Sequence, residues 1–138
     1  MSLAEKEIEI IEDFAIYDDW MEKYEYIIEL GKDLPKISDQ YKIQENIIVG
    51  CQSQVWLHAE KVDGLVKFTA EADAIIAKGI ISLLIQVLSN ETPESIIDAK
   101  LDFIKEIGLQ EHLSPTRSNG LVAMVKKMKI YALALKNK

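Results

Sequence analysis

Cys51 is the only cysteine of this chain, and it lies between Gly50 and a run of polar residues at positions 52–54. A lone cysteine cannot form a disulfide within the chain, and it cannot hold a metal cluster alone. Its thiol is therefore either a covalent nucleophile or a small, inert apolar side chain of the core. Because glycine permits a tight turn and a strand-like run begins at Val55, we expect the thiol to lie on a turn that a partner can reach.

A reactive thiolate needs a positive neighbour or the free N–H groups of a helix N-terminus. Arg117 is the candidate, because Pro115 is typical of the first turn of a helix. The alternative for Arg117 is an ordinary surface arginine. Gln52, Ser53 and Gln54 either donate hydrogen bonds to a sulfur anion or serve only as turn and edge residues.

Other kinds of site find little support in the sequence. The two histidines, His58 and His112, are far apart and lack the clustered ligands of a zinc or iron–sulfur centre, so we expect no metal. No glycine-rich phosphate loop is present, and the many carboxylates indicate solvated helix faces. The net charge of −7 and the pI of about 4.9 argue against nucleic acids and anionic membranes as partners.

The length of 138 residues predicts a single domain, residues 1–138, with a substantial core. The most apolar stretch, residues 74–88, is too short to span a bilayer and contains Lys78 and Gln86, so we expect a core helix. Acidic residues in the first turns argue against a signal peptide. One reduced thiol without a disulfide framework favours the cytoplasm.

Helices are expected at the start of the chain. The capping-box spacing of Ser2 and Glu5 predicts a first helix. A second helix is expected to be capped by Asp18 and ended by Gly31 in a left-handed turn. The residues expected to face inward from these two helices are Ile8, Ile11, Ala15, Met21, Tyr24, Ile27 and Ile28.

A period of two then replaces the helical period. Residues 54–60 alternate between apolar and polar, and Asp63-Gly64 predicts a two-residue hairpin. The returning strand is expected to place Val66, Phe68, Ala70 and Ala72 on one face. Residues 47–49 are expected to add a third short strand. The predicted class is α+β, with a small three-stranded antiparallel sheet packed by helices.

Three more helices are predicted after this sheet. Asp73 is expected to cap a central apolar helix, and Thr92-Pro93 to begin another that runs to Gly108. The last helix is expected to begin at Ser114-Pro115. Its expected inner residues are Leu121, Met124, Val125, Met128 and Leu135.

Residues 45–56, ENIIVGCQSQVW, closely resemble the active-site segment of the SufE family, whose motif reads roughly Gly-Cys-Gln-Ser-x-Val-Trp. Residues 73–79 resemble that family's strand-to-helix junction. Residues 113–121 resemble its Leu-Thr-Pro-x-Arg-x-x-Gly-Leu signature, and the length and element order agree over nearly the whole chain. The departures are Ala72, where a polar residue is expected, and the apolar Val49. Neither removes a chemical group that the motif requires.

The resemblance implies the fold of IscU-type cluster scaffolds and a role as sulfur acceptor. It implies that Cys51 takes persulfide sulfur from a SufS-like, pyridoxal-phosphate-dependent cysteine desulfurase and stimulates that enzyme. The sulfur then passes to a SufBCD-like iron–sulfur scaffold. The chain itself needs no cofactor and is not a stand-alone enzyme. The supporting residues implied are Gly50, Gln52, Ser53, Gln54 and Arg117, with Asp73 in partner binding.

Three alternatives stay open. The first is a CsdE-like partner of a different desulfurase that feeds another sulfur pathway. The second is a thiol-dependent enzyme, although the motif contains no base beside Cys51. The third is an interaction module with an inert cysteine. We expect a monomer or weak homodimer, in which the resting Cys51 side chain packs against apolar neighbours and swings out when a partner docks.

Overall fold

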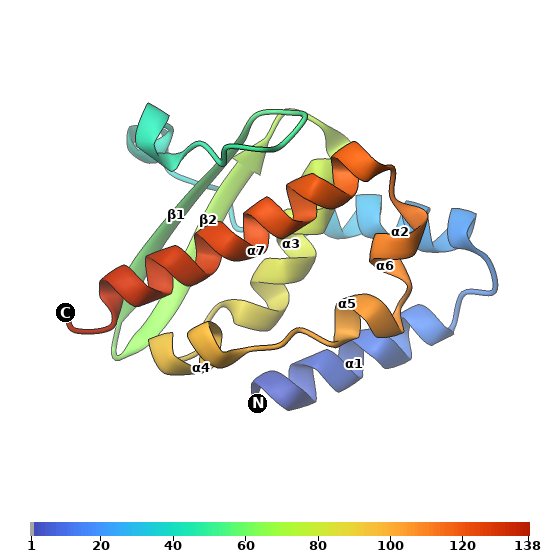
Figure 1. Cartoon of the computed structure of the whole chain (residues 1–138), viewed down its shortest axis with the longest axis horizontal. Helices are drawn as coiled ribbons and strands as arrows, with labels where there is room; N and C mark the ends of the chain where they lie inside the picture. The colour runs from blue at the N-terminus through green and yellow to red at the C-terminus, as the bar shows by residue number, and fades with distance from the viewer. Residues whose placement is uncertain (1) are drawn as a thin grey trace.

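A computed structural model describes residues 2–138, and Figure 1 shows one long hairpin at the left of the view, with helices packed against it. No helix within this range is long and apolar enough to cross a membrane. The elements are α1 (Leu3–Ala15), α2 (Trp20–Leu30), β1 (Val55–Val62), β2 (Leu65–Ala72), α3 (Ile75–Leu88), α4 (Pro93–Asp98), α5 (Phe103–Glu106), α6 (Leu109–His112) and α7 (Pro115–Leu135), with single 3-10 turns at Gly31–Asp33, Asp39–Tyr41 and Gln44–Asn46.

The hairpin β1–β2 forms as the alternation predicts. Val55 pairs with Ala72 at one end and Val62 with Leu65 at the other, which leaves a two-residue turn. Asp63 and Gly64 both have positive φ, 54° and 82°, as a type I′ turn requires. The face that turns toward α3 and α7 is buried and contains Val55, Leu57, Val66, Phe68, Ala70 and Ala72.

The expected third strand is wrong, although the mixed class with a small antiparallel sheet packed by helices is confirmed. The sheet within residues 2–138 has two strands. Ile47 forms only an isolated bridge to Trp56, and the N–H of Ile48 donates to the carbonyl of Val55 at 2.8 Å. The ladder stops there because the chain turns immediately at residues 49–50, where Gly50 has a φ of 103°.

The first two helices form, and part of the expected inner face is confirmed: Ile27 is buried, and Ile11, Tyr24 and Ile28 pack against the core. The Ser2–Glu5 capping box is present. In α1 the buried residues are Ile10 and Phe14, whereas Ile8, which is 54% exposed, and Ala15 do not face inward as expected. Met21 is also exposed on α2, and Asp19 rather than Asp18 accepts the capping hydrogen bond.

Gly31 does not end α2 in a left-handed turn, because its φ is −63°. Gly31 instead allows close packing of the two helices, because a Cβ at this position would lie 3.0 Å from the backbone nitrogen of Gly79. A Cβ at Gly79 would lie 2.1 Å from the carbonyl oxygen of Ile27. The two helices α2 and α3 therefore cross with their backbones nearly in contact, and the Ser82 hydroxyl donates to the Leu30 carbonyl at 2.9 Å across the crossing.

The helix predicted to run from Pro93 to Gly108 is broken in two. α4 ends at Asp98, and Leu101 takes a positive φ of 56° before α5 begins. This turn lets the Leu101 side chain enter the core, where it is 5% exposed. The stop at Gly108 is confirmed by its left-handed φ of 75°, and the start of α7 is confirmed by the Ser114 cap.

Two glycine substitutions test the importance of backbone contact. Gly79→Ala should destabilise the fold by about 3 kcal/mol or more, because its methyl group would collide with a main-chain carbonyl. Gly120→Ala is the matched control, since its methyl group would meet Cys51 at an ordinary 3.6 Å. Urea unfolding of both variants measures the difference. Equal stabilities would show that α2 and α3 can separate without cost.

Candidate functional site

Cys51 lies on an irregular loop that is seated against the first turns of α7. Its side chain is half-buried and packs against the core, as we expected for the resting thiol. The thiol lies 3.7 Å from the carbonyl oxygen of Gly120, close enough for a weak S–H···O hydrogen bond. A methyl group at position 120 would lie 3.6 Å from Sγ, an ordinary contact distance, so Gly120 leaves open space beside the sulfur that the resting thiol itself does not require.

Gly50 makes this approach possible. Its φ of 103° lies in a region that residues with a Cβ rarely adopt. A Cβ at this position would also lie 3.4 Å from Cβ of Ala123 on α7. The loop therefore turns sharply in front of α7 and presents the thiol to the helix face formed by Gly120 and Ala123.

Arg117 is close enough to act electrostatically on the Cys51 thiol, and it also contacts Ser53. The Ser114 hydroxyl caps α7 by accepting the N–H of Arg117 at 3.2 Å, which fixes the arginine in the first turn. The guanidinium of Arg117 donates to the Ser53 hydroxyl at 3.5 Å, a long bond that ties the loop to the helix. The structure thus brings together two residues, Ser53 and Arg117, that lie 64 positions apart.

Two opposing effects act on the Cys51 thiol. Burial raises its pKa, and the positive charge of Arg117 lowers it, with the result that the pKa stays above its ordinary value. At neutral pH the resting thiol is therefore protonated. In this conformation the charge of Arg117 does not offset the effect of burial.

Asp73 does not cap α3, contrary to expectation. The cap position of α3 is Ala74, which makes no side-chain hydrogen bond. The Asp73 carboxylate instead accepts the N–H of Gln54 at 3.0 Å, and its own N–H donates to the Gln54 carbonyl at 3.1 Å. This pair of bonds fixes the end of the Cys51 loop to the end of β2.

Gln52 occupies the glutamine position of the motif, and Gln54 occupies its variable position. Gln52 and Gln54 are both exposed, and within residues 2–138 neither side chain donates a hydrogen bond to Cys51. Gln54 contributes through its backbone, which Asp73 holds. A role of either amide toward a sulfur anion remains a prediction for the partner-bound state.

Asn46 is a positioning residue that the sequence reasoning missed. It is 8% exposed, donates to the carbonyl of Tyr41 at 2.7 Å, and accepts from the hydroxyl of Tyr131 on α7 at 2.5 Å. These bonds attach the segment before Cys51 to the C-terminal part of α7. The signal in the sequence was a single amide, Asn46, directly before the apolar residues 47–49.

No group of three or more His, Cys, Asp and Glu side chains in residues 2–138 is arranged to hold a metal ion. His58 is stacked on Tyr41 with 3.6 Å between ring centroids, and His112 is stacked on Trp20. Both imidazoles therefore have structural partners in the fold.

The hydrogen bond from the Gln54 N–H to the Asp73 carboxylate can be tested with two substitutions of Asp73, one of which is isosteric. Asp73→Ala should lower the free energy of unfolding by about 1 kcal/mol or less, because water can partly replace this exposed bond. It should also speed hydrogen exchange at the Gln54 amide. Asp73→Asn keeps the acceptor oxygen and should retain the protection. If Asp73→Ala left hydrogen exchange at the Gln54 amide unchanged, this hydrogen bond would have no role in ordering the Cys51 loop.

The pH dependence of alkylation tests the balance at Cys51. With one cysteine in the chain, the iodoacetamide rate reports this thiol alone. The rate should rise with pH through an apparent pKa above the ordinary value of about 8.5. Arg117→Ala should move this apparent pKa higher and Arg117→Lys should restore part of the effect. An apparent pKa at or below the ordinary value would contradict the burial that we describe.

Two relatives are similar in sequence to this chain over most of its length. Over 127 residues the chain is 43% identical to an uncharacterised SufE-like protein of Rhizobium meliloti (strain 1021), covering 88% of this chain and 90% of that protein. It is 38% identical to another SufE-like protein, from Rhizobium etli, again over 127 residues, covering 88% of this chain and 85% of the relative.

The fold is also found in a solved structure. The solution structure of a hypothetical protein from Thermus thermophilus superposes with a TM-score of 0.81, at 21% identity, covering 96% of this chain and 97% of that one. Finally, the family model described as "SufE: Fe-S metabolism associated domain" matches residues 8–132. The chain belongs to the SufE family, whose domain is associated with iron–sulfur metabolism.

Proposed function

We propose that this protein is a sulfur carrier, and that Cys51 accepts persulfide sulfur from a cysteine desulfurase and delivers it to an iron–sulfur assembly scaffold. The observation that carries the proposal is the position of the only thiol. It lies on a glycine-hinged loop, half-buried, beside the arginine of the first turn of α7. Membership of a family associated with iron–sulfur metabolism supports the same assignment.

The transfer is a thiol–persulfide exchange. The Cys51 thiolate attacks the outer sulfur of the donor persulfide, one S–S bond forms on Cys51, and the S–S bond of the donor breaks. The donor cysteine leaves with the electron pair as a thiolate and can take up the proton that Cys51 gave up. One S–S bond replaces another, so the step needs no oxidant or reductant. Arg117 is the nearest candidate to stabilise the anion on Cys51, before and after transfer.

The resting position of the thiol suits a carrier. A protonated, half-buried thiol reacts slowly with oxidants and alkylating agents, whereas docking that draws the loop outward would expose it and lower its pKa. Val49 is 88% exposed although it is apolar, and it lies two residues before Cys51. We propose that Val49 and the exposed Asp73 contribute to the surface that a desulfurase contacts.

The other interpretations have weaker support. A thiol-dependent enzyme would need a base that activates Cys51, and within residues 2–138 the hydrogen-bond partner of the thiol is the carbonyl of Gly120. An inert core cysteine would not require the left-handed Gly50 or a neighbouring arginine. Delivery to a different sulfur pathway uses the same chemistry, and only the identity of the acceptor separates it from the proposal.

Intact-mass measurement tests the assignment of Cys51. The protein is incubated with a cysteine desulfurase of the same organism and cysteine, and its mass is recorded without reductant. The wild type should gain sulfur, and Cys51→Ser should gain none while remaining folded. The proposal would be overturned if every cysteine desulfurase of that organism turned over cysteine without adding sulfur to this protein.

Gly120→Ala tests the niche itself. The added methyl group would lie at an ordinary 3.6 Å from the resting Sγ, but it would fill space that a second sulfur atom could occupy. We therefore expect slower sulfur loading with little change in the free energy of unfolding. Ala134→Gly on an exposed part of the same helix serves as the control for altered helix propensity. A loading rate equal to that of the wild type would show that the space in front of Gly120 is not used.

A further inference from the structure

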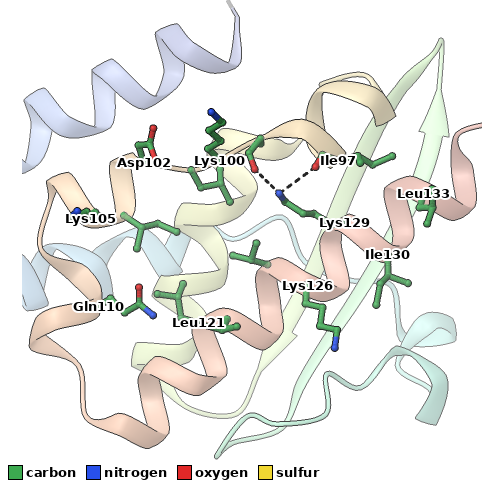
Figure 2. Close-up of a pocket in the computed structure, with 15 residues that line it drawn as sticks. Ile97, Lys100, Asp102, Lys105, Gln110, Leu121, Lys126, Lys129, Ile130 and Leu133 are labelled. Carbon is green, nitrogen blue, oxygen red and sulfur yellow. Dashed lines mark hydrogen bonds between the residues drawn. The ribbon is translucent and has the colours of Figure 1, made fainter.

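A long apolar groove lies between α7 and the segment that joins α4 to α5. Its volume is about 630 Å³, and it does not include Cys51 or Arg117. Figure 2 shows Leu121 at one end of the groove and Leu133 at the other, both from α7. The apolar side chains that line it are Ile97, Leu101, Ile104, Leu121, Val122, Val125, Ile130 and Leu133.

The groove has a fixed wall. The ammonium group of Lys129 on α7 reaches across and donates to the main-chain carbonyls of Ile97 and Ala99, as the dashed lines in Figure 2 show. These carbonyls lie at the C-terminal end of α4. The last carbonyls of a helix have no N–H partner within the helix, so they need a donor from elsewhere. Lys129 therefore links α7 to the end of α4 and fixes the width of the groove between them.

Several apolar side chains of this surface face water. Val122 is 52% exposed, Ile130 is 49% exposed and Leu133 is 62% exposed. They follow one side of α7 from Val122 to Leu133, which corresponds to roughly 17 Å of helix. Lys126 lies between Val122 and Ile130 on this side of the helix, so the apolar residues form a strip that one charged side chain interrupts. Exposed apolar surface that is grouped beside charged side chains is typical of an interaction site.

The charge around the groove is opposite to that of the whole protein. The chain has a net charge of −7, yet α7 contains one arginine, three lysines and no acidic residue. Lys100, Lys105 and Lys126 are exposed at the edges of the groove, and Asp102 is the acidic residue among those that line it. An occupant that matches this surface has an apolar stripe flanked by carboxylates.

We propose that this groove binds an acidic amphipathic helix of a partner protein. Such a helix would place apolar side chains at i, i+3 or i+4, and i+7 along the groove, with Asp and Glu beside them to meet Lys100, Lys105 and Lys126. The strip on α7 is long enough for about three turns of the bound helix.

The groove and the thiol use different faces of α7. Gly120 and Ala123 face the Cys51 loop, whereas Val122 and Val125 line the groove. Because successive helical residues are separated by about 100°, a helix bound in the groove leaves the loop uncovered. The same molecule can therefore hold one partner in the groove while Cys51 exchanges sulfur with another.

A displayed peptide library tests the proposal without assuming sulfur transfer, so its failure and that of the carrier function can be told apart. The probe is a library of helical peptides of about 14 residues, with apolar residues fixed at i, i+4, i+7 and i+11 and all other positions randomised. Selection uses the wild-type protein with Leu133→Asp as competitor. Enrichment of Asp and Glu beside the apolar stripe is the expected result.

Fluorescence anisotropy then measures the affinity of the selected peptide. Leu133→Asp and Lys126→Glu change exposed side chains and should each weaken binding by about tenfold or more. Met21→Asp and Lys32→Glu, which alter exposed residues outside the groove, should bind as the wild type does. Circular dichroism confirms that every variant is folded.

Several results would overturn the proposal. One is a selection that yields no peptide able to discriminate wild type from Leu133→Asp, and another is enrichment of basic or neutral sequences. Unchanged affinity in Lys126→Glu would remove the charge argument. Sedimentation that shows a wild-type dimer and a Leu133→Asp monomer would assign the groove to a second copy of this chain instead.

Discussion

The site depends on one contact, the seating of the Cys51 loop against the glycine face of α7. A left-handed Gly50 turns the loop, and Gly120 leaves room for the sulfur on the helix. The loop is then held on both sides: Asp73 binds the backbone of Gln54, and Asn46 ties the preceding segment to Tyr131. These hydrogen bonds fix the segments on both sides of Cys51.

The electrostatics of the site follow from the same contact. Burial raises the pKa of Cys51 more than Arg117 lowers it, which keeps the resting sulfur protonated. The two effects respond differently to movement. Drawing the side chain into a more polar environment removes the cost of burial, whereas the arginine stays on the rigid first turn of α7. Under the proposed function, docking of a partner would determine when the sulfur becomes a nucleophile.

The sequence predicted the elements that depend on local signals. The Asp63-Gly64 hairpin, the Ser2 capping box and the starts of α4 and α7 all formed, because short-range hydrogen bonds and backbone preferences determine them. The family and the class of fold were also predicted, and both are confirmed.

The predictions that the structure contradicts concern features that depend on long-range packing. Ile8 and Ala15 of α1 were expected to face inward and are exposed, because the positions of α3 and α5, which contact α1, select the buried face. Gly31 was expected to turn and instead allows α2 to touch α3. Asp73 was expected to cap a helix and instead binds the Cys51 loop. The role of Gly120 emerges only when α7 and the loop are placed side by side, since 69 residues separate it from Cys51.

Single-turnover transfer tests the central claim most directly. A desulfurase carrying its persulfide is freed of cysteine, mixed with an equal amount of this protein and quenched at intervals for peptide mass spectrometry. The account predicts that sulfur lost by the donor appears one for one on the peptide that contains Cys51, while the donor thiol is restored. Loss of donor sulfur as free sulfide, without its appearance on Cys51, would contradict the account.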